Sequence, residues 1–180
     1  MLKTIKISLC MLGLAAAALG PVSHVYADKN DQEASKSYQM LNRASFDNYI
    51  AMFNAKNPQA FEAYFADDMR MQNGHLVLSG IPAVKEHYHK IWSLMKEELN
   101  VVNYVSDGSS LAVEMKTHFT VMHDSDNSPF GKVKKGENFD YHGVIIYKIN
   151  HMGKFNDIKV AYLDFTRTTD GVTQSLGIVH

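Results

Sequence analysis

The chain has few of the residues that carry covalent or metal chemistry. Cys10 is the only cysteine among 180 residues, and it lies in an N-terminal apolar run that we expect to be removed. The remaining chain would then have no disulfide, no thiolate nucleophile and no cysteine metal ligand. Its stability in an oxidising compartment must therefore come from its hydrophobic core.

The sequence also lacks a surplus of positive charge. Its 18 lysine and arginine residues face 19 acidic ones, for a formal net charge of −1. Proteins that bind nucleic acid through its phosphates normally carry a basic excess, so we expect no nucleic-acid partner. Internal repeats and linkers are missing as well, and the length therefore predicts one globular domain.

The N-terminal apolar run is too short to cross a membrane. Residues 7–19 fall below the roughly 20 apolar residues that a spanning helix needs. Two lysines precede the run, a Gly-Pro pair ends it, and Val25-Tyr26-Ala27 offers small or compact residues at a cleavage site. This order predicts a signal peptide over residues 1–27 and an exported protein, periplasmic or secreted. The alternative is an uncleaved N-terminal anchor.

Helical periodicity follows a polar leader at residues 28–36. Apolar side chains recur every three or four residues, which predicts helices over residues 38–53, 58–65 and 80–95. Asn57 before Pro58 fits an N-cap followed by a proline at the first helical position. The last of these stripes extends to Met95.

The rest of the chain shows the alternation and turn residues of strands. Two short strands are expected around Asn73-Gly74, and longer ones over residues 101–105, 111–121, 139–149 and 155–166. A polar loop is expected over residues 124–138 and a tail over residues 169–180. Helices grouped before strands predict an α+β fold. We expect three N-terminal helices packed on a strongly curved antiparallel or mixed sheet, with a conical pocket between them.

Several segments, in their order and spacing, resemble nuclear transport factor 2-like (cystatin-like) domains. Residues 49–57 followed by residues 65–68 are similar to the opening of these domains. Residues 80–84 are similar to the start of their third helix, and residues 153–158 to their last hairpin. The resemblance spans residues 38–165, within a domain that we place at residues 37–168. It implies a cone-shaped fold with an apolar pocket, often dimeric through the sheet, and leaves the activity open.

Within this superfamily, the polyketide cyclases of the SnoaL type resemble the chain better than the ketosteroid isomerases do. Tyr49 matches the oxyanion-binding tyrosine of the isomerases, but Asn73 stands at their basic aspartate and Ile145 near their second acid. An amide cannot abstract a proton, so that mechanism is excluded. The acid/base aspartate of the cyclases corresponds to Asp164, and their pocket histidine to His118.

The residues themselves also favour Asp164. Simple alternation puts it on the same strand face as Val160 and Tyr162, where partial burial would raise the pKa of its carboxyl. The alternative is a carboxylate held by the backbone or by Arg167. His142 on the neighbouring strand is either its acid/base partner or a satisfied core histidine.

The remaining candidates have structural alternatives too. His118 lies opposite the apolar face of its strand, so it reaches the pocket only through a β-bulge. Tyr49 is either a pocket phenol or a core residue, and Asn73 is either a pocket amide or a turn residue. The candidate sites are therefore catalytic Asp164, His142 and His118, with Tyr49, Asn73 and Tyr162 binding substrate.

No metal or cofactor is expected, because His87 and His89, two residues apart on a helix, point to opposite sides. The predicted function is an exported SnoaL-like protein that binds a small apolar molecule in its pocket. It is either a cofactor-free acid/base isomerase, cyclase or hydrolase, or a non-catalytic module that binds ligands or proteins. A homodimer through the sheet is expected from the resemblance.

Overall fold

The computed structural model describes residues 41–177, so the predicted signal peptide and polar leader lie outside the described residues. Helix α2 (Arg43–Asn54) begins after Asn42, whose side chain accepts a hydrogen bond from the Ser45 N–H at 2.9 Å. Helix α3 (Gln59–Tyr64) follows Asn57, which accepts from the Gln59 N–H, and α4 spans Gly80–Leu94. The three expected helices are confirmed, but the first begins at Arg43 and not at residue 38, and Pro58, not Asn57, is at the N-cap of α3. Within residues 41–177, no helix is long and apolar enough to cross a membrane.

One mixed sheet forms the body of the protein. Its strands lie in the order β2-β1-β8-β7-β4-β3, with β9 added beside β8. Strands β1 and β8 are parallel, and the other neighbours are antiparallel. The strands are β1 (Phe65–Asn73), β2 (Leu76–Ser79), β3 (Met95–Ser106), β4 (Ser110–Val121), β7 (Asn138–Ile149), β8 (Phe155–Thr169) and β9 (Val172–Ser175).

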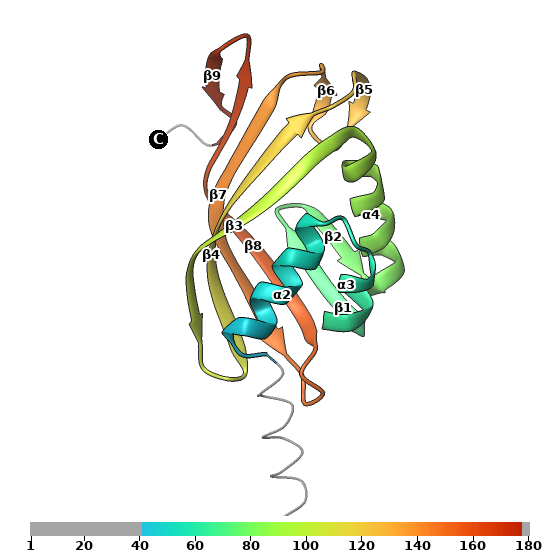
Figure 1. Ribbon diagram of the computed structural model, residues 1–180, viewed down its shortest axis with the longest axis vertical. Coiled ribbons are helices and arrows are strands. Elements are labelled where there is room, and N and C mark those ends of the chain that lie inside the picture. The colour runs from blue at the N-terminus through green and yellow to red at the C-terminus, as the bar shows by residue number, and fades with distance from the viewer. Residues whose placement is uncertain (1–40, 178–180) are drawn as a thin grey trace, which may run out of the picture.

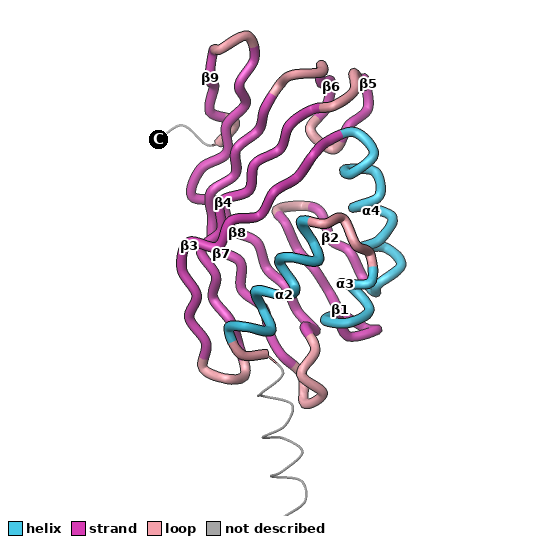
Figure 2. Tube along the Cα trace, in the orientation of Figure 1, coloured by secondary structure: helices cyan, strands magenta, loops and turns pink. Residues whose placement is uncertain are grey.

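The helices lie on one side of this sheet, and the long strands curve around them (Figure 1). Side chains from α2, α3 and the concave sheet face fill the narrow end, where Phe46, Phe53, Phe61, Phe65 and Phe155 are almost completely buried. Figure 2 shows the same arrangement of helices against strands. The predicted α+β fold with a strongly curved sheet is confirmed.

The junction between α4 and β3 differs from the expectation. Met95 is the first residue of β3 and not the last of a helix, so the strand begins six residues before residue 101. Burial alternates along β3 from Met95 through Glu97, because this edge pairs with β4 from Val121 inward. Met95 continues the helical spacing by coincidence, and strand pairing decides its conformation.

Two other segments also form strands that the sequence did not predict. The expected polar loop contains a small hairpin, β5 (Ser125–Ser128) and β6 (Gly131–Val133). In the expected tail, β8 continues to Thr169, and the chain then turns back to form β9 beside it. Backbone pairing with a neighbouring strand orders both segments although their side chains are mostly polar.

Candidate functional site

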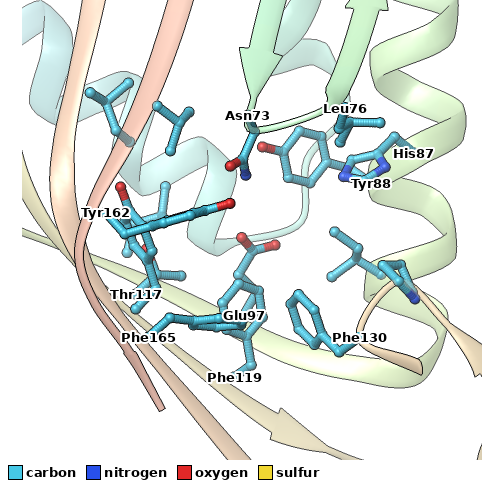
Figure 3. A pocket seen from close by; sticks show the side chains of 16 residues that line it. Asn73, Leu76, His87, Tyr88, Glu97, Thr117, Phe119, Phe130, Tyr162 and Phe165 are labelled. Atoms are coloured by element: carbon cyan, nitrogen blue, oxygen red, sulfur yellow. The ribbon is translucent and has the colours of Figure 1, made fainter. Parts of the chain in front are cut away.

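A cavity of about 310 Å³ opens between the concave face of the sheet and α4. This volume is at the lower end of the roughly 300–1,000 Å³ range of small-molecule pockets. Its walls are mainly apolar, with a few polar side chains among them (Figure 3). The lining residues are Asn73, Leu76, His87, Tyr88, Ile91, Glu97, Leu99, Thr117, Phe119, Pro129, Phe130, Tyr141, Ile145, Val160, Tyr162 and Phe165.

Glu97 is the buried acidic group of this cavity. It lies on β3 opposite Phe119 of β4, its side chain points inward, and the residue is only 4% exposed. Burial raises the pKa of its carboxyl to about 8, because the charged form loses hydration that the apolar walls do not replace. Glu97 is therefore mostly a neutral acid at pH 7, in the range useful for proton transfer.

Two groups on the helix side of the cavity hold and tune this carboxyl. The indole Nε1 of Trp92, near the end of α4, donates to Glu97 Oε2 at 3.0 Å. Lys56 reaches the same region and donates from Nζ to the carbonyl oxygens of Trp92 and Met95 at 3.4 and 3.3 Å. Both groups lower the pKa of Glu97, but less than burial raises it. They leave the cavity side of the carboxyl open to a ligand (Figure 3).

Asn73 supplies a second polar group at the end of β1. Its Oδ1 is buried and has no hydrogen-bond partner among the described residues. Its side chain, the Glu97 carboxyl and the Tyr162 hydroxyl point toward the same space in Figure 3. Buried acceptors are normally satisfied, so an orphaned one at a cavity wall is a candidate ligand contact.

Tyr88 and His87 complete the polar lining from α4. Burial raises the pKa of the Tyr88 phenol well above its ordinary value, and the nearby Glu97 adds to the rise. Burial also lowers the pKa of His87, assisted by Lys90, which favours the neutral form of this imidazole. His89 is exposed on the other side of the helix, as expected. Among residues 41–177, no group of three or more His, Cys, Asp or Glu could hold a metal ion.

The β5–β6 hairpin covers one end of the cavity with Phe130. Its ring packs on Phe119, Phe139 and Phe165 with centroid distances of 5.0, 4.8 and 5.5 Å. In Figure 1 this hairpin stands beside α4. Phe130 and Pro129 therefore extend the apolar wall beyond the sheet.

Asp164 does not face this cavity, so its expected placement is wrong. It is exposed and lines a separate hollow of about 550 Å³ on the outer, convex face of the sheet. The reason is a β-bulge: His142 pairs with Asp164, but the next residue, Gly143, pairs with Tyr162. Leu163 is the extra residue, and it reverses the alternation so that Tyr162 points inward and Asp164 outward.

The two candidate histidines lie on the same outer face. His142 is the cross-strand neighbour of Asp164, as expected, but its Nε2 lies 2.8 Å from Glu114 Oε1. His118 Nδ1 lies 2.7 Å from Asp140 Oδ1. No bulge turns His118 inward, because β3, β4 and β7 stay in register around it. The expected placement of His142 in the pocket is therefore wrong, whereas His118 lies opposite the apolar face of its strand, where simple alternation placed it.

The predicted substrate-binding residues separate into two groups. Asn73 and Tyr162 line the cavity, as expected, and their role in binding stays a prediction. Tyr49 is instead a core residue: it is 4% exposed and packs against Phe53, Phe65 and Phe155. Its expected placement at the pocket is wrong, because the aromatic side chains of α2 fill the narrow end of the cone.

Sequence reasoning missed Glu97. It lies in a charged stretch, Lys96-Glu97-Glu98, between an expected helix and an expected strand. The signal that could have found it is the alternation of Met95, Glu97, Leu99 and Val101, which continues the inward face of β3. A carboxyl inside such an apolar series is a candidate functional residue.

This chain belongs to the SnoaL-like domain family. The family model described as "SnoaL-like domain" matches residues 46–158, more than half of the chain. The expected membership in SnoaL-like proteins is thereby confirmed. A search of curated protein sequences finds no match.

Solved structures share the fold at low sequence identity. A protein of Pseudomonas putida described as a polyketide cyclase is 23% identical, with a TM-score of 0.55, covering 65% of this chain and 87% of that one. SalBIII, an epoxide hydrolase/cyclase-like enzyme of pyran ring formation in salinomycin, is 15% identical, with a TM-score of 0.52 and coverages of 73% and 92%. An LEH-like epoxide hydrolase of M. tuberculosis is 10% identical, with a TM-score of 0.51 and coverages of 73% and 83%. These likenesses show the fold.

Proposed function

We propose that this protein is a cofactor-free enzyme that uses Glu97 for proton transfer on a small, mainly apolar molecule bound in the cavity. The observation that carries the proposal is the buried Glu97 carboxyl, held by Trp92 and open to the cavity on its other side. A carboxyl that has a pKa near 8 is a better acid/base group at neutral pH than an exposed one.

Because Glu97 is mostly protonated at pH 7, its first role is that of a general acid. It donates its proton to an oxygen of the substrate as a C–O bond opens or as a carbonyl accepts electrons. Water or an internal hydroxyl then attacks the carbon, and the proton that this nucleophile loses returns to the Glu97 carboxylate. The SnoaL-like neighbours that are described as cyclases and epoxide hydrolases support this class of reaction.

Two probe reactions test the proposal. Purified protein is incubated with styrene oxide, and with 2-tetralone in D₂O, and hydrolysis and deuterium incorporation are followed by mass spectrometry. We expect a rate above buffer for at least one probe, and a loss of about 100-fold or more in Glu97→Gln.

The matched control is Glu98→Gln, because Glu98 is the next residue on the same strand but is exposed on the outer face beside Lys96. It should keep the full rate. Equal rates in Glu97→Gln and wild type would remove the catalytic proposal. A cavity that binds the probes without converting them would favour the alternative, a non-catalytic ligand-binding module.

A protein-interaction module of the same fold is the weaker alternative. Such a module needs no open cavity, whereas this chain has a cavity of about 310 Å³ between the concave face of its sheet and α4. The outer face does expose Val105 and Ile146 beside Ala112, which supports the expected homodimer through the sheet. We propose this dimer as well, and light scattering on wild type and on Ile146→Glu tests it. A mass of one chain for wild type would exclude it.

Export to the periplasm or medium is also a proposal. It rests on the order of basic, apolar and small residues at positions 1–27. Expression of the full chain in a bacterium, followed by fractionation and N-terminal sequencing, should give exported protein that starts at Asp28. An intact N-terminus on membrane-bound protein would indicate an anchor instead.

A further inference from the structure

The polar groups of the cavity are placed so that they select a particular kind of ligand. Asn73 Oδ1 is a buried acceptor without a partner among the described residues. The Glu97 carboxyl is a second polar group, and one of its oxygens is already bound by Trp92. The other side of the carboxyl and the Asn73 amide point into the same space (Figure 3). A ligand that fills this space must satisfy Asn73 or leave it unpaired.

The charge of the lining excludes an anionic ligand. The 16 described residues that line the cavity include no lysine and no arginine. Lys56 lies outside the lining, and its ammonium group donates to the carbonyl oxygens of Trp92 and Met95. An anion would therefore lose its hydration without gaining a counter-ion, which is costly in an apolar site.

A cationic ligand is disfavoured for a different reason. Glu97 is the one acidic residue among the 16 that line the cavity, and Trp92 and Lys56 already approach it from the helix side. A ligand ammonium would meet a mostly protonated carboxyl beside the positive charge of Lys56. It would also lose its own hydration to walls made largely of Leu76, Ile91, Phe119, Phe130 and Phe165.

We infer that the cavity takes an uncharged, largely apolar molecule that carries a hydroxyl or another neutral donor, and that this donor binds Asn73 Oδ1. Asn73 on β1 is then the residue that selects for the donor, and Glu97 acts on the same ligand from β3, at the far edge of the sheet. This inference rests on the cavity that the proposed function uses, but it concerns binding only.

A matched set of probes tests the inference. Isothermal titration at pH 6.5 compares 2-naphthol, 2-methoxynaphthalene, 2-naphthoate and 2-(aminomethyl)naphthalene, which share one apolar body and differ in donor and charge. We expect 2-naphthol to bind roughly tenfold more tightly than 2-methoxynaphthalene, because only the naphthol satisfies the buried acceptor. The carboxylate and the amine should bind at least tenfold more weakly than 2-naphthol.

Variants of Asn73 connect this preference to the residue. In Asn73→Leu, 2-naphthol and 2-methoxynaphthalene should bind within about twofold of each other, because no acceptor is left. Asn73→Ala is the second variant, in case leucine disturbs folding. Asn156→Leu, an exposed asparagine on β8, is the control and should keep the tenfold preference.

Three results would overturn the inference. They are a charged probe that binds as tightly as 2-naphthol, a naphthol preference that survives in both Asn73 variants, and no binding of any probe. Failure of the proposed function looks different. It would appear as unchanged turnover in Glu97→Gln, while the naphthol preference and its dependence on Asn73 could still hold.

Discussion

Trp92 Nε1 donates to Glu97 Oε2 at 3.0 Å across the point where α4 ends and β3 begins. Glu97 is five positions after Trp92, and the chain passes from helix to strand between them. Trp92 is itself held by the aromatic core: its ring stacks on Phe61 and meets Phe53 edge-on. The core of the narrow end thus positions the acidic group of the open end.

Removal of the Trp92 donor should raise the pKa of Glu97 above its value of about 8. The hydrogen bond stabilises the carboxylate, so Trp92→Phe loses this stabilisation and keeps the burial. Carbon-13 NMR of labelled glutamate side chains measures the change. Lys96→Met is the control, because Lys96 is exposed and pairs with Glu98 on the outer face. An unchanged pKa in Trp92→Phe would show that the indole does not tune the carboxyl.

Stability should fall as the pH rises from about 5 to about 8 because of Glu97. Its pKa is about 8 in the folded protein and near 4.5 in the unfolded chain, so the folded state binds the extra proton in this interval. The contribution to the free energy of unfolding is complete below pH 4.5. It declines by up to about 1.4 kcal/mol for each pH unit until pH 8.

Urea denaturation of wild type and Glu97→Gln over this range measures the effect. The difference between the two proteins isolates the Glu97 contribution from all other titrating groups. Relative to the variant, wild type should become less stable by a few kcal/mol between pH 5 and pH 8. Parallel curves would mean that Glu97 titrates at its ordinary value.

The outer-face residues should not be needed for turnover. Asp164→Asn and His142→Phe change side chains on the convex side of the sheet, away from the cavity. We expect both variants to convert the probe substrates within about twofold of wild type, whereas Glu97→Gln does not. If Asp164→Asn alone abolished turnover, the catalytic role that the resemblance implied would be restored and the role of Glu97 would be wrong.

Gly143 should be difficult to replace. The Tyr141 hydroxyl crosses over it to donate to the Ala161 carbonyl at 3.0 Å, and a Cβ at Gly143 would clash with both oxygens. Gly143→Ala should therefore lower the free energy of unfolding by about 1–3 kcal/mol. Gly177→Ala, where a Cβ meets only Ser175 Oγ at ordinary contact distance, should change it by less than about 0.5 kcal/mol. Equal stabilities would show that the bulge relaxes freely.

The position of Asp164 on the outer face, and not in the cavity, shows what sequence reasoning could not predict. Period-two alternation is a local rule, and it held along β8 from Ile158 to Tyr162. The extra residue, Leu163, exists only relative to the partner strand β7, so no pattern within residues 155–169 reveals it. Glu97 was missed for a related reason: the start of β3 is set by its pairing with β4, while its own residues also fit a helix.

The amino-acid sequence by itself determined the three helices and the long strands, the α+β class, the family and two of the cavity residues, Asn73 and Tyr162. These follow from periodicity and turn chemistry, which act over a few residues at a time. Only the tertiary structure decided which carboxyl is enclosed. Enclosure depends on the register of paired strands, and on a β-bulge between strands, that bring together residues far apart in the sequence. As a result, Glu97 and not Asp164 is the acid that faces the cavity.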